Sequence, residues 1–530
     1  MQRTVLPYAD TGRFSPLVVD YLRSAPELRE FYRWSPDREG LRAAADARTF
    51  DPAARTLLCD VLERQYAGMP VPPQVRQSLD RLRHPKALTV TTGHQLCLFT
   101  GPLYVPFKIL NVVRLAGELS RADRPVVPVF WMATEDHDRA EVDHAWINDT
   151  KVQWPGQAEG PVGRLPLEGI GPVVQEAGAL LGPGTHADEL RALLQRCYRP
   201  EHTLAQATRL FVDALFGRFG VLVLDADNPG LKRLFAPVMR EELLNQVAVR
   251  CVRYANEKLD GHWRSQAFAR DINLFHLRPG HRSRIGLHGD RFQVLDGGPS
   301  FSLDELLAEL DRHPEDFSPN VLMRPLYQET ILPNVAYVGG GGELAYWMQL
   351  KWLFQAVQLP MPVLMLRTSA AFLSDKDAAR LRELGLTAQD LFTPLAGLQA
   401  RVALARAPFP TGMEEEKEAA RAFYHRLQQR AASADATLKG AAEAIAVRAM
   451  RGLESMERKL LRAAKRREQA PLQQLHRVHA AFFPGGGLQE RRANFMPWYA
   501  REGPAFFDRL LAALDPLDPN FTVLPLLPAN

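Results

Sequence analysis

The chain has 530 residues, of which 46% are hydrophobic and 24% are charged, and its formal net charge is +4. This length favours roughly two to four structural units of ordinary domain size. The small net charge gives no reason to expect a nucleic-acid partner. No stretch reaches the ~20 apolar residues of a membrane-spanning helix, so we expect no membrane partner either.

The cysteines are scattered along the chain and none forms a C-x-x-C pair. Such spacing favours neither a zinc ribbon nor a disulfide framework, and we predict no metal site of the protein's own. Reduced thiols are typical of cytosolic proteins. The first residues, MQRTVLPYADTGRF, also lack the apolar core of a signal peptide. We therefore expect a cytoplasmic protein.

Residues 1–150 are expected to hold N-terminal helices and the first half of an α/β core. Helical spacing covers residues 24–33 and 42–67, and a proline-rich segment follows. ALTVTTGHQ then predicts a strand that enters a turn, VPFKILNVVRLAGELSRA a helix, and RPVVPVFWMATED a second strand. Strand, helix and strand in this order form the βαβ unit of a parallel sheet.

The same alternation returns further along the chain. Residues 151–205 are rich in glycine and proline and predict an inserted segment, and residues 206–255 continue the core. Residues 256–320 predict a second insertion that contains a β-hairpin. Residues 321–405 are expected to complete the core, with a strand, a four-glycine turn and a helix in NVAYVGGGGELAYW and a further strand in MPVLMLRTS.

Residues 406–480 predict a helical, coiled-coil-like arm, and residues 481–530 are expected to return to the core. Apolar residues from Phe423 to Leu460 follow steps of four and three, close to the heptad rule. Capping residues and a glycine between Ser433 and Gly440 favour two helices folded back on each other, with one continuous helix as the alternative. The apolar stripe suggests a dimer contact. The basic stretch KLLRAAKRR could suggest nucleic acid, but a solvated coiled-coil face is the favoured interpretation.

Polar segments follow four of the predicted strands. They are TGHQ, ATEDHD, LDADN and YVGGGGE. Parallel sheets bind ligands beyond the carboxyl ends of their strands. We therefore expect these four segments to face one shared crevice.

The first candidate segment is TTGHQLCLFTG, with Lys108 in the helix that follows. Glycine lets the backbone approach a ligand, and a helix start offers free N–H groups to an anion. No P-loop motif is present, and the alternative is a tight turn before a capped helix. The predicted substrate-binding residues are Thr92, Gly93, Gln95, Thr100, Gly101 and Lys108, and His94 is a candidate for catalysis.

The second candidate segment is the acidic stretch WMATEDHDRAEVDH. Glu135, Asp136 and His137 are candidates for acid–base catalysis, and Asp138 for substrate binding. A polar solvated loop is the second interpretation. A metal site, with His137 and Glu141 on one helix face, ranks third.

Two later segments complete the candidate site. RPLYQETILPNVAYVGGGGELAYWMQLK contains a glycine turn suited to an anion or a sugar; the alternative is a loose turn before a buried aromatic helix. In FFPGGGLQERRANF, side chains from Gln489 to Asn494 could line a pocket or cap a helix, and the sequence favours neither interpretation. The predicted substrate-binding residues are Tyr327, Gln328, Glu343, Trp347 and Lys351, and the predicted cofactor-binding residues are Gly339, Gly340, Gly341, Gly342 and Asn494.

Together, TGHQLCLFTGPLY, PVFWMATEDHDRAEV, RPLYQETILPNVAYVGGGGELAYW and FPGGGLQERRANF resemble the signature segments of the bacillithiol-synthesis cysteine-adding enzymes. The resemblance covers nearly the whole chain in the same order. It implies a Rossmann-type core similar to class I aminoacyl-tRNA synthetases, with inserted connecting segments and an α-helical coiled-coil arm that joins a homodimer.

The resemblance also implies a reaction. L-Cysteine would be joined through its carboxyl group to the amine of glucosaminyl-malate, which forms an amide in the last step of bacillithiol synthesis. ATP or ADP would bind, with Mg²⁺ as a possible companion. The malate dianion needs a basic contact, for which Lys108, Arg324 and Lys351 are candidates. Two alternatives remain open: a non-catalytic nucleotide-binding subunit, and a metal-dependent hydrolase built on the acidic stretch and His144.

Overall fold

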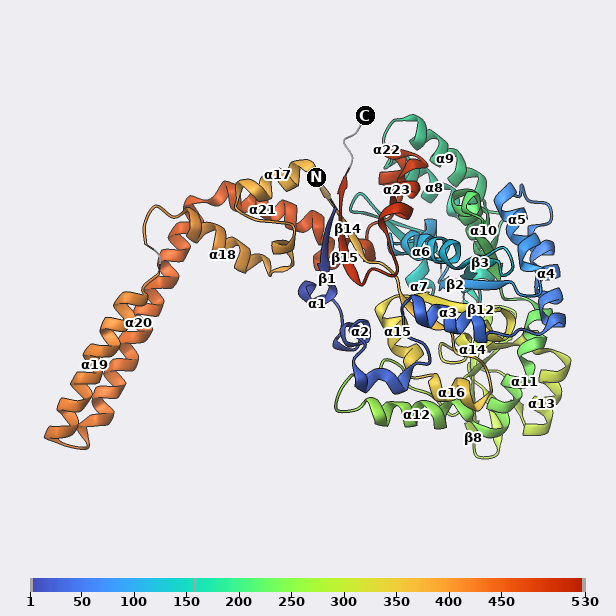
Figure 1. Cartoon of the computed structure of the whole chain (residues 1–530), viewed down its shortest axis with the longest axis horizontal. Helices are drawn as coiled ribbons and strands as arrows, with labels where there is room; N and C mark the ends of the chain where they lie inside the picture. Colours follow the sequence, from blue (N-terminus) through green and yellow to red (C-terminus); the bar gives the residue numbers. More distant parts are fainter. Residues whose placement is uncertain (1–2, 157–158, 411, 527–530) are drawn as a thin grey trace. The chain divides into compact units, whose positions relative to one another are not determined.

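The computed structural model describes residues 3–156, 159–410 and 412–526 (Figure 1). The chain forms two compact units. The larger contains Val5–Ala371 and Gly487–Thr522, and the smaller consists mainly of Phe372–Gly486. The chain passes from one to the other within three strands that pair in the order β1-β15-β14, namely β1 (Thr4–Pro7), β14 (Ala370–Ser374) and β15 (Asn520–Leu526).

A five-stranded parallel sheet is the centre of the larger unit. Its order is β13-β12-β2-β3-β6, so the strands, counted along the chain, lie in the order 3-2-1-4-5 from one edge. This is the Rossmann order, and the predicted fold class is confirmed. Strand order reverses between β2 and β12, which makes this gap the topological switch point. The strands are β2 (Leu88–His94), β3 (Val126–Met132), β6 (Leu222–Asp225), β12 (Asn334–Gly339) and β13 (Val363–Leu366).

The strands are apolar because helices cover both faces of the sheet. β3, VVPVFWM, is buried at every position. Val90 and Val126 of the sheet pack against Val112 of α6 (Tyr104–Leu119), the predicted βαβ helix, and against Leu41 of α3 (Arg38–Ala47). Each such side chain stabilises the fold by roughly 1.5–3 kcal/mol when fully buried.

The N-terminal helices differ from the prediction in one respect. Residues 42–67 form two helices, α3 and α4 (Pro52–Tyr66). The break lies at Asp51, whose carboxylate accepts a hydrogen bond from the amide of Ala54 at 2.7 Å, and Pro52 occupies the first helical position. An Asp-Pro pair of this kind starts a helix and cannot sit inside one. Other N-terminal elements are α1 (Tyr8–Thr11), α2 (Pro16–Leu22), η1 (Pro26–Phe31) and α5 (Pro73–Leu82).

Two segments are inserted between the strands of the sheet. Between β3 and β6 lie the hairpin β4 (His144–Ile147) and β5 (Thr150–Gln153), then α8 (Ile170–Ala179), α9 (Thr185–Cys197) and α10 (Leu204–Phe216). Between β6 and β12 lie α11 (Pro229–Asn245), α12 (Val247–Leu259) and an antiparallel sheet, which contains the expected hairpin. That sheet has the order β10-β9-β8-β7-β11 and is formed by β7 (Leu274–Arg278), β8 (His281–His288), β9 (Arg291–Val294), β10 (Ser300–Phe301) and β11 (Phe317–Pro319), with α13 (Leu303–Arg312) beside it.

The helices that position the candidate site are short. They are α7 (Arg139–Val142), α14 (Arg324–Ile331), α15 (Gly341–Met348) and α16 (Lys351–Ala356). Two further helices, α22 (Met496–Glu502) and α23 (Ala505–Ala513), lie near the C-terminal end of the larger unit.

The smaller unit contains the predicted helical hairpin (Figure 1). α19 (Glu414–Ala434) and α20 (Leu438–Arg467) lie side by side, and Lys417 of one pairs with Glu457 of the other at 2.7 Å. The turn falls at Asp435, whose carboxylate accepts hydrogen bonds from the amide and hydroxyl of Thr437 at 2.8 Å each. Gly440 lies inside α20, so the turn is shorter than expected. The unit also contains α17 (Asp375–Glu383), α18 (Leu395–Arg406) and α21 (Gln469–Phe482).

Helices in the described ranges are all too short or too polar to cross a membrane.

Candidate active site

The carboxyl ends of the five parallel strands bring the predicted polar segments to one edge. The strand register places His94 beside Met132, and Met132 beside Asp225. The amide nitrogen of Gln95 after β2 donates to Asp136 after β3 at 2.7 Å and to Glu141 at 2.5 Å. The structure therefore joins the TGHQ and acidic segments directly.

At the switch point, Lys108 of α6 connects β2 to the start of α15. Its ammonium is 1% exposed, donates to the carbonyl oxygen of Gly93 at 3.0 Å and lies 2.5 Å from the carboxylate of Glu343. Glu343 also accepts from the amide of Gly340 at 2.8 Å and from the hydroxyl of Tyr337 at 2.5 Å. Burial opposes ionisation, but Lys108 and these hydrogen bonds lower the pKa of Glu343 to about 2. Glu343 is thus a fixed carboxylate that positions Lys108 and the glycine turn.

His94 lies in a neutral group beside this ion pair. Its Nε2 atom is 3.4 Å from the hydroxyl of Tyr104 and 3.6 Å from the thiol of Cys97. Loss of hydration, together with the charge of Lys108, lowers the pKa of His94 to about 3. Burial raises the pKa of Cys97 to about 12. The imidazole and the thiol are therefore uncharged near neutral pH, and His94 is a weak base.

Two guanidinium groups flank the glycine positions. Arg367, the first residue after β13, donates to Glu490 at 2.7 Å, and its Nε has no hydrogen-bond partner among the described residues. A Cβ atom placed on Gly340 would lie 3.8 Å from that nitrogen. A Cβ atom placed on Gly93 would likewise lie 3.7 Å from a guanidinium nitrogen of Arg324 in α14. The same Cβ atoms would lie 3.6 Å from the Trp131 side chain at Gly93 and 3.4 Å from the Glu343 carboxylate at Gly340, so both arginines lie close to the glycine backbone beside other side chains.

A second group of charges lies after β3 and β6. The carboxylate of Glu135 pairs with the buried ammonium of Lys232, which is also 3.4 Å from Asp227. Asp227 receives two hydrogen bonds from the guanidinium of Arg164, at 2.7 and 2.8 Å. Burial raises the pKa of Glu135, although Lys232 counteracts it. The pKa of Asp227 is lowered against the effect of burial by Arg164 and Lys232.

The other acidic residues have separate partners. Asp136 accepts from the backbone amides of His137 and Asp138, which fixes the loop. The ring of His137 is hydrogen-bonded to Arg282 of β8 at 2.8 Å, and burial and that positive charge lower its pKa. The side chain of Asp138 is exposed. Since His137 faces Arg282 whereas Glu141 bonds Gln95, the predicted metal pair is not assembled; within the described ranges no group of three His, Cys, Asp or Glu side chains could hold a metal ion.

Three other predicted substrate-binding residues are buried supports. The hydroxyl of Tyr327 donates to the carbonyl oxygen of Ala226 at 2.6 Å. Gln328 accepts from Arg324 at 3.1 Å. Trp347 stacks on Tyr337, with ring centroids 4.5 Å apart. Gln328 holds Arg324, Trp347 packs on the tyrosine that bonds Glu343, and all three side chains are buried.

The turn after β2 is held by its own hydrogen bonds. The hydroxyl of Thr92 donates to the carbonyl oxygen of Val338 at 2.8 Å. The amide of Asn494 donates to the carbonyl oxygens of Phe99 at 3.0 Å and of Gly101 at 2.7 Å. Thr100 has a positive φ of 64°, and a Cβ atom on Gly101 would come within 2.5 Å of Cys97. Asn494 thus braces a strained turn, whereas sequence reasoning placed it at a cofactor.

The four glycines form the approach to α15. Gly339 ends β12, Gly340 precedes the helix, and none of the four has a positive φ. A Cβ atom on Gly342 would meet nothing within 4 Å. Gly342 therefore leaves open space near the first N–H groups of the helix, whereas a Cβ atom on Gly339 would come within 3.0 Å of Tyr337 and one on Gly341 within 3.1 Å of Val18.

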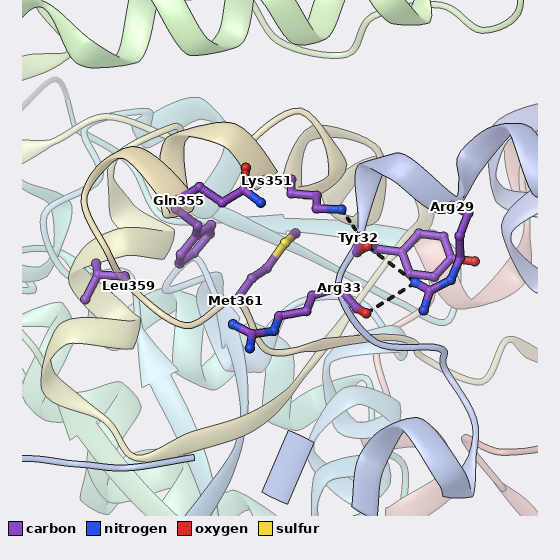
Figure 2. Close-up of a pocket in the computed structure, with 8 residues that line it drawn as sticks. Arg29, Tyr32, Arg33, Lys351, Gln355, Leu359 and Met361 are labelled. Atoms are coloured by element: carbon purple, nitrogen blue, oxygen red, sulfur yellow. Dashed lines mark hydrogen bonds between the residues drawn. The ribbon is translucent and has the colours of Figure 1, made fainter. Parts of the chain in front are cut away.

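Lys351 is not part of this network. It begins α16, donates to the carbonyl oxygen of Tyr32 at 3.1 Å, and lines a separate hollow with Arg29 and Arg33 (Figure 2).

Sequence reasoning also missed several charged partners. Arg367 directly follows a predicted strand, and the strand-end rule that selected the acidic segment could have selected it. No local signal marks Arg164, Lys232 or Arg282, because each comes from an insertion or a distant helix.

Comparison with known proteins gives the family. The model of the bacillithiol biosynthesis BshC N-terminal Rossmann-like domain matches residues 1–368, and that of the BshC C-terminal coiled-coil domain matches residues 370–526. The chain belongs to the BshC family. The resemblance found in the sequence is thereby confirmed.

BshC relatives align along almost their full length. A protein of Flavobacterium johnsoniae is 38% identical and covers 99% of this chain and 100% of its own length. Proteins of Cytophaga hutchinsonii and Salinibacter ruber are 36% and 32% identical, and each alignment covers 96% of both chains. All three carry the name "Putative cysteine ligase BshC". Glu490 and Asn494 fall within the residues matched by the coiled-coil domain, yet they belong to the larger unit and support the site.

Proposed function

We propose that this protein is a ligase of bacillithiol synthesis, which joins the carboxyl group of L-cysteine to the amine of glucosaminyl-malate as an amide. Family membership supports the pathway. One observation carries the chemistry: Gln95 connects an acidic segment to the turn after β2, where two arginines lie close to glycine backbone at the same sheet edge. A substrate with both a dianion and an amine needs both parts, an anion-accepting half with the arginines and an acidic half.

The anion-accepting half would bind the malate group and a nucleotide. Arg324, which faces Gly93, is our assignment for malate. Arg367, with its unpartnered Nε, and the start of α15, where Gly342 leaves open space, fit a phosphate group. ATP would supply the activation that a carboxylate needs before an amine can attack it, with Mg²⁺ as its companion.

The acidic half would handle the amine. Asp136 keeps lone pairs free while Gln95 and two backbone amides hold its position, so we assign to it the proton of the substrate ammonium group. The ion pair between Glu135 and Lys232 lies next to Asp136 in the chain and contributes to the electrostatic potential at its carboxylate. His94 receives a binding role and not a proton-transfer role, since its pKa of about 3 makes it a weak base.

The compartment proposed for this reaction is the cytoplasm. Cys59, Cys97, Cys197 and Cys251 are free thiols in the structure. Such thiols fit a reducing compartment.

The test is a direct assay. The purified protein is incubated with L-cysteine, glucosaminyl-malate and ATP, and the amide product and nucleotide by-product are measured by mass spectrometry. Asp136→Asn should lower kcat by about 10²–10⁴-fold, the range of lost acid–base catalysis. The exposed Asp138→Asn is the matched control, with a smaller effect. ATP binding without amide formation would favour a structural nucleotide-binding subunit, and no product with verified substrates would contradict the proposal.

A further inference from the structure

A hollow in the larger unit is lined by residues other than those of the charged network at the strand ends. It has a volume of about 450 Å³, within the range of small-molecule sites. η1 and the residues after it form one side, and α16 with the chain leading to β13 forms the other (Figure 2). The lining residues are Arg29, Tyr32, Arg33, Lys351, Phe354, Gln355, Leu359 and Met361.

The charged lining of this hollow is entirely positive. Arg29, Arg33 and Lys351 contribute three cations, and no carboxylate lines the hollow. Glu30, the nearest acid along the chain, already pairs with Lys258 at 3.1 Å. Burial and the charges of Arg29 and Arg33 lower the pKa of Lys351, whereas the carboxylate of Glu30 raises it, so Lys351 is close enough for both arginines to repel it.

Lys351 and Arg29 are held by neutral acceptors, and the guanidinium of Arg33 lies over the ring of Trp34, 4.8 Å from its centroid. Lys351 donates to the carbonyl oxygen of Tyr32 at 3.1 Å, and Arg29 donates to that of Arg33 at 3.2 Å. In the part of the chain that the structure describes, none of the three forms an ion pair with a carboxylate. An anion in the hollow would replace weak neutral contacts with charge-assisted hydrogen bonds and would relieve the repulsion.

The rest of the lining is apolar. Met361 is 4% exposed and lies between Lys351 and Arg33 (Figure 2). Phe354 and Leu359 extend the apolar surface. A ligand with only an anionic group would leave this surface in water, whereas one with an additional apolar portion would cover it.

We propose that this hollow binds a small organic compound that carries a multivalent oxyanion, either a phosphate group or a dicarboxylate, next to an apolar portion. This inference does not rest on the proposed ligase reaction, although Phe354 of the lining stacks on Trp347, a support of the candidate active site, with ring centroids 5.8 Å apart. It also gives Lys351 a role that the candidate active site does not.

Isothermal titration with pyrophosphate and with L-malate tests this proposal and separates the two oxyanion sources. We expect at least one probe to bind the full-length protein at a site that persists in Arg367→Gln, with an affinity that falls as salt rises. The double variant Arg33→Gln/Lys351→Gln should weaken binding by about tenfold or more. The exposed Arg42→Gln, outside the hollow, is the matched control and should bind as the parent protein does.

A charge-conserving variant keeps the test decisive if the double variant does not fold. Arg33→Lys/Lys351→Arg should fold and retain binding within a few fold. Absence of binding by both probes would overturn the proposal. So would binding that survives in the double variant but is lost in Arg367→Gln, since the anion would then sit at the start of α15.

Discussion

Glu343 is held as a carboxylate by several partners in the candidate site. Its carboxylate is held by an ammonium, a hydroxyl and a backbone amide at once. Removing such a partner from a buried pair is costly because the remaining charge is left without compensation. The residue is thus as important to folding as to binding.

This leads to a pH prediction for stability. The pKa of Glu343 is about 2 in the folded protein against a usual 4.5, so the ionised form stabilises the fold above pH 4.5 and this contribution is lost as the pH falls toward 2. The difference corresponds to about 3 kcal/mol. Urea unfolding between pH 5 and pH 2 should show a smaller loss of stability in Glu343→Gln than in the parent protein. The exposed Glu176→Gln should keep the full loss, and equal slopes in all three proteins would contradict this prediction.

His94 gives a prediction about activity. Because its pKa is about 3, the imidazole is neutral throughout the range in which the enzyme would work. His94→Gln preserves a neutral hydrogen-bonding side chain and should keep the shape of the kcat/KM profile from pH 6 to pH 9, with a loss of at most about tenfold. A profile that loses an ionisation in the variant would show that His94 transfers a proton after all.

At the scale of elements, the turn from Cys97 to Gly101 depends on a side chain nearly 400 residues away, since Asn494 and Phe99 are separated by 395 positions. Phe99 and Thr100 have positive φ values of 53° and 64°. Residues other than glycine adopt that conformation only where the surroundings enforce it. Asn494 supplies part of that enforcement.

Asn494→Ala should therefore destabilise the protein by about 1–3 kcal/mol, because two buried carbonyl oxygens lose their donors. Hydrogen exchange should increase most in residues 97–103. The exposed Asn245→Ala is the control and should change stability by less than about 0.5 kcal/mol. An exchange pattern unchanged in the turn would mean that Asn494 does not brace it.

Most helices and strands could be predicted from the sequence, but the contacts between distant segments could not. The βαβ unit and the helical hairpin follow from apolar periodicity, and the strand ends correctly located Gln95, Asp136 and Glu343. The partners Lys232 and Arg282 could not be found, because their contacts depend on how whole insertions fold back. The break at Asp51 was missed although the Asp-Pro signal was present, because apolar spacing continues through it.

At the scale of the whole molecule, the helical hairpin raises the question of whether two copies of the chain form a dimer. Large apolar side chains on α19 and α20 are about half exposed in the single chain, including Ile445 and Met456 at 49% each. They lie three helical turns apart on one face. Exposed apolar stripes of this kind mark interfaces, so the homodimer remains our prediction.

Ile445→Asp/Met456→Asp should shift the protein from dimer to monomer, as measured by light scattering after size exclusion. Each charge would have to be buried against the partner's apolar face, which is strongly unfavourable. Glu443→Gln, exposed on the same helix, should leave the dimer intact. A parent protein that is monomeric at tens of micromolar would rule the prediction out.

The position of Glu490 has a consequence for biosynthesis on the ribosome. Arg367 and Glu490 are separated by 123 residues, with the helical hairpin between them. At bacterial elongation rates, this interval lasts roughly 6–25 s. During that time the nascent Rossmann-like domain must hold a guanidinium without its counter-ion. A product that ends between Arg367 and Glu490 would therefore contain the whole parallel sheet but lack the pair that Arg367 forms with Glu490.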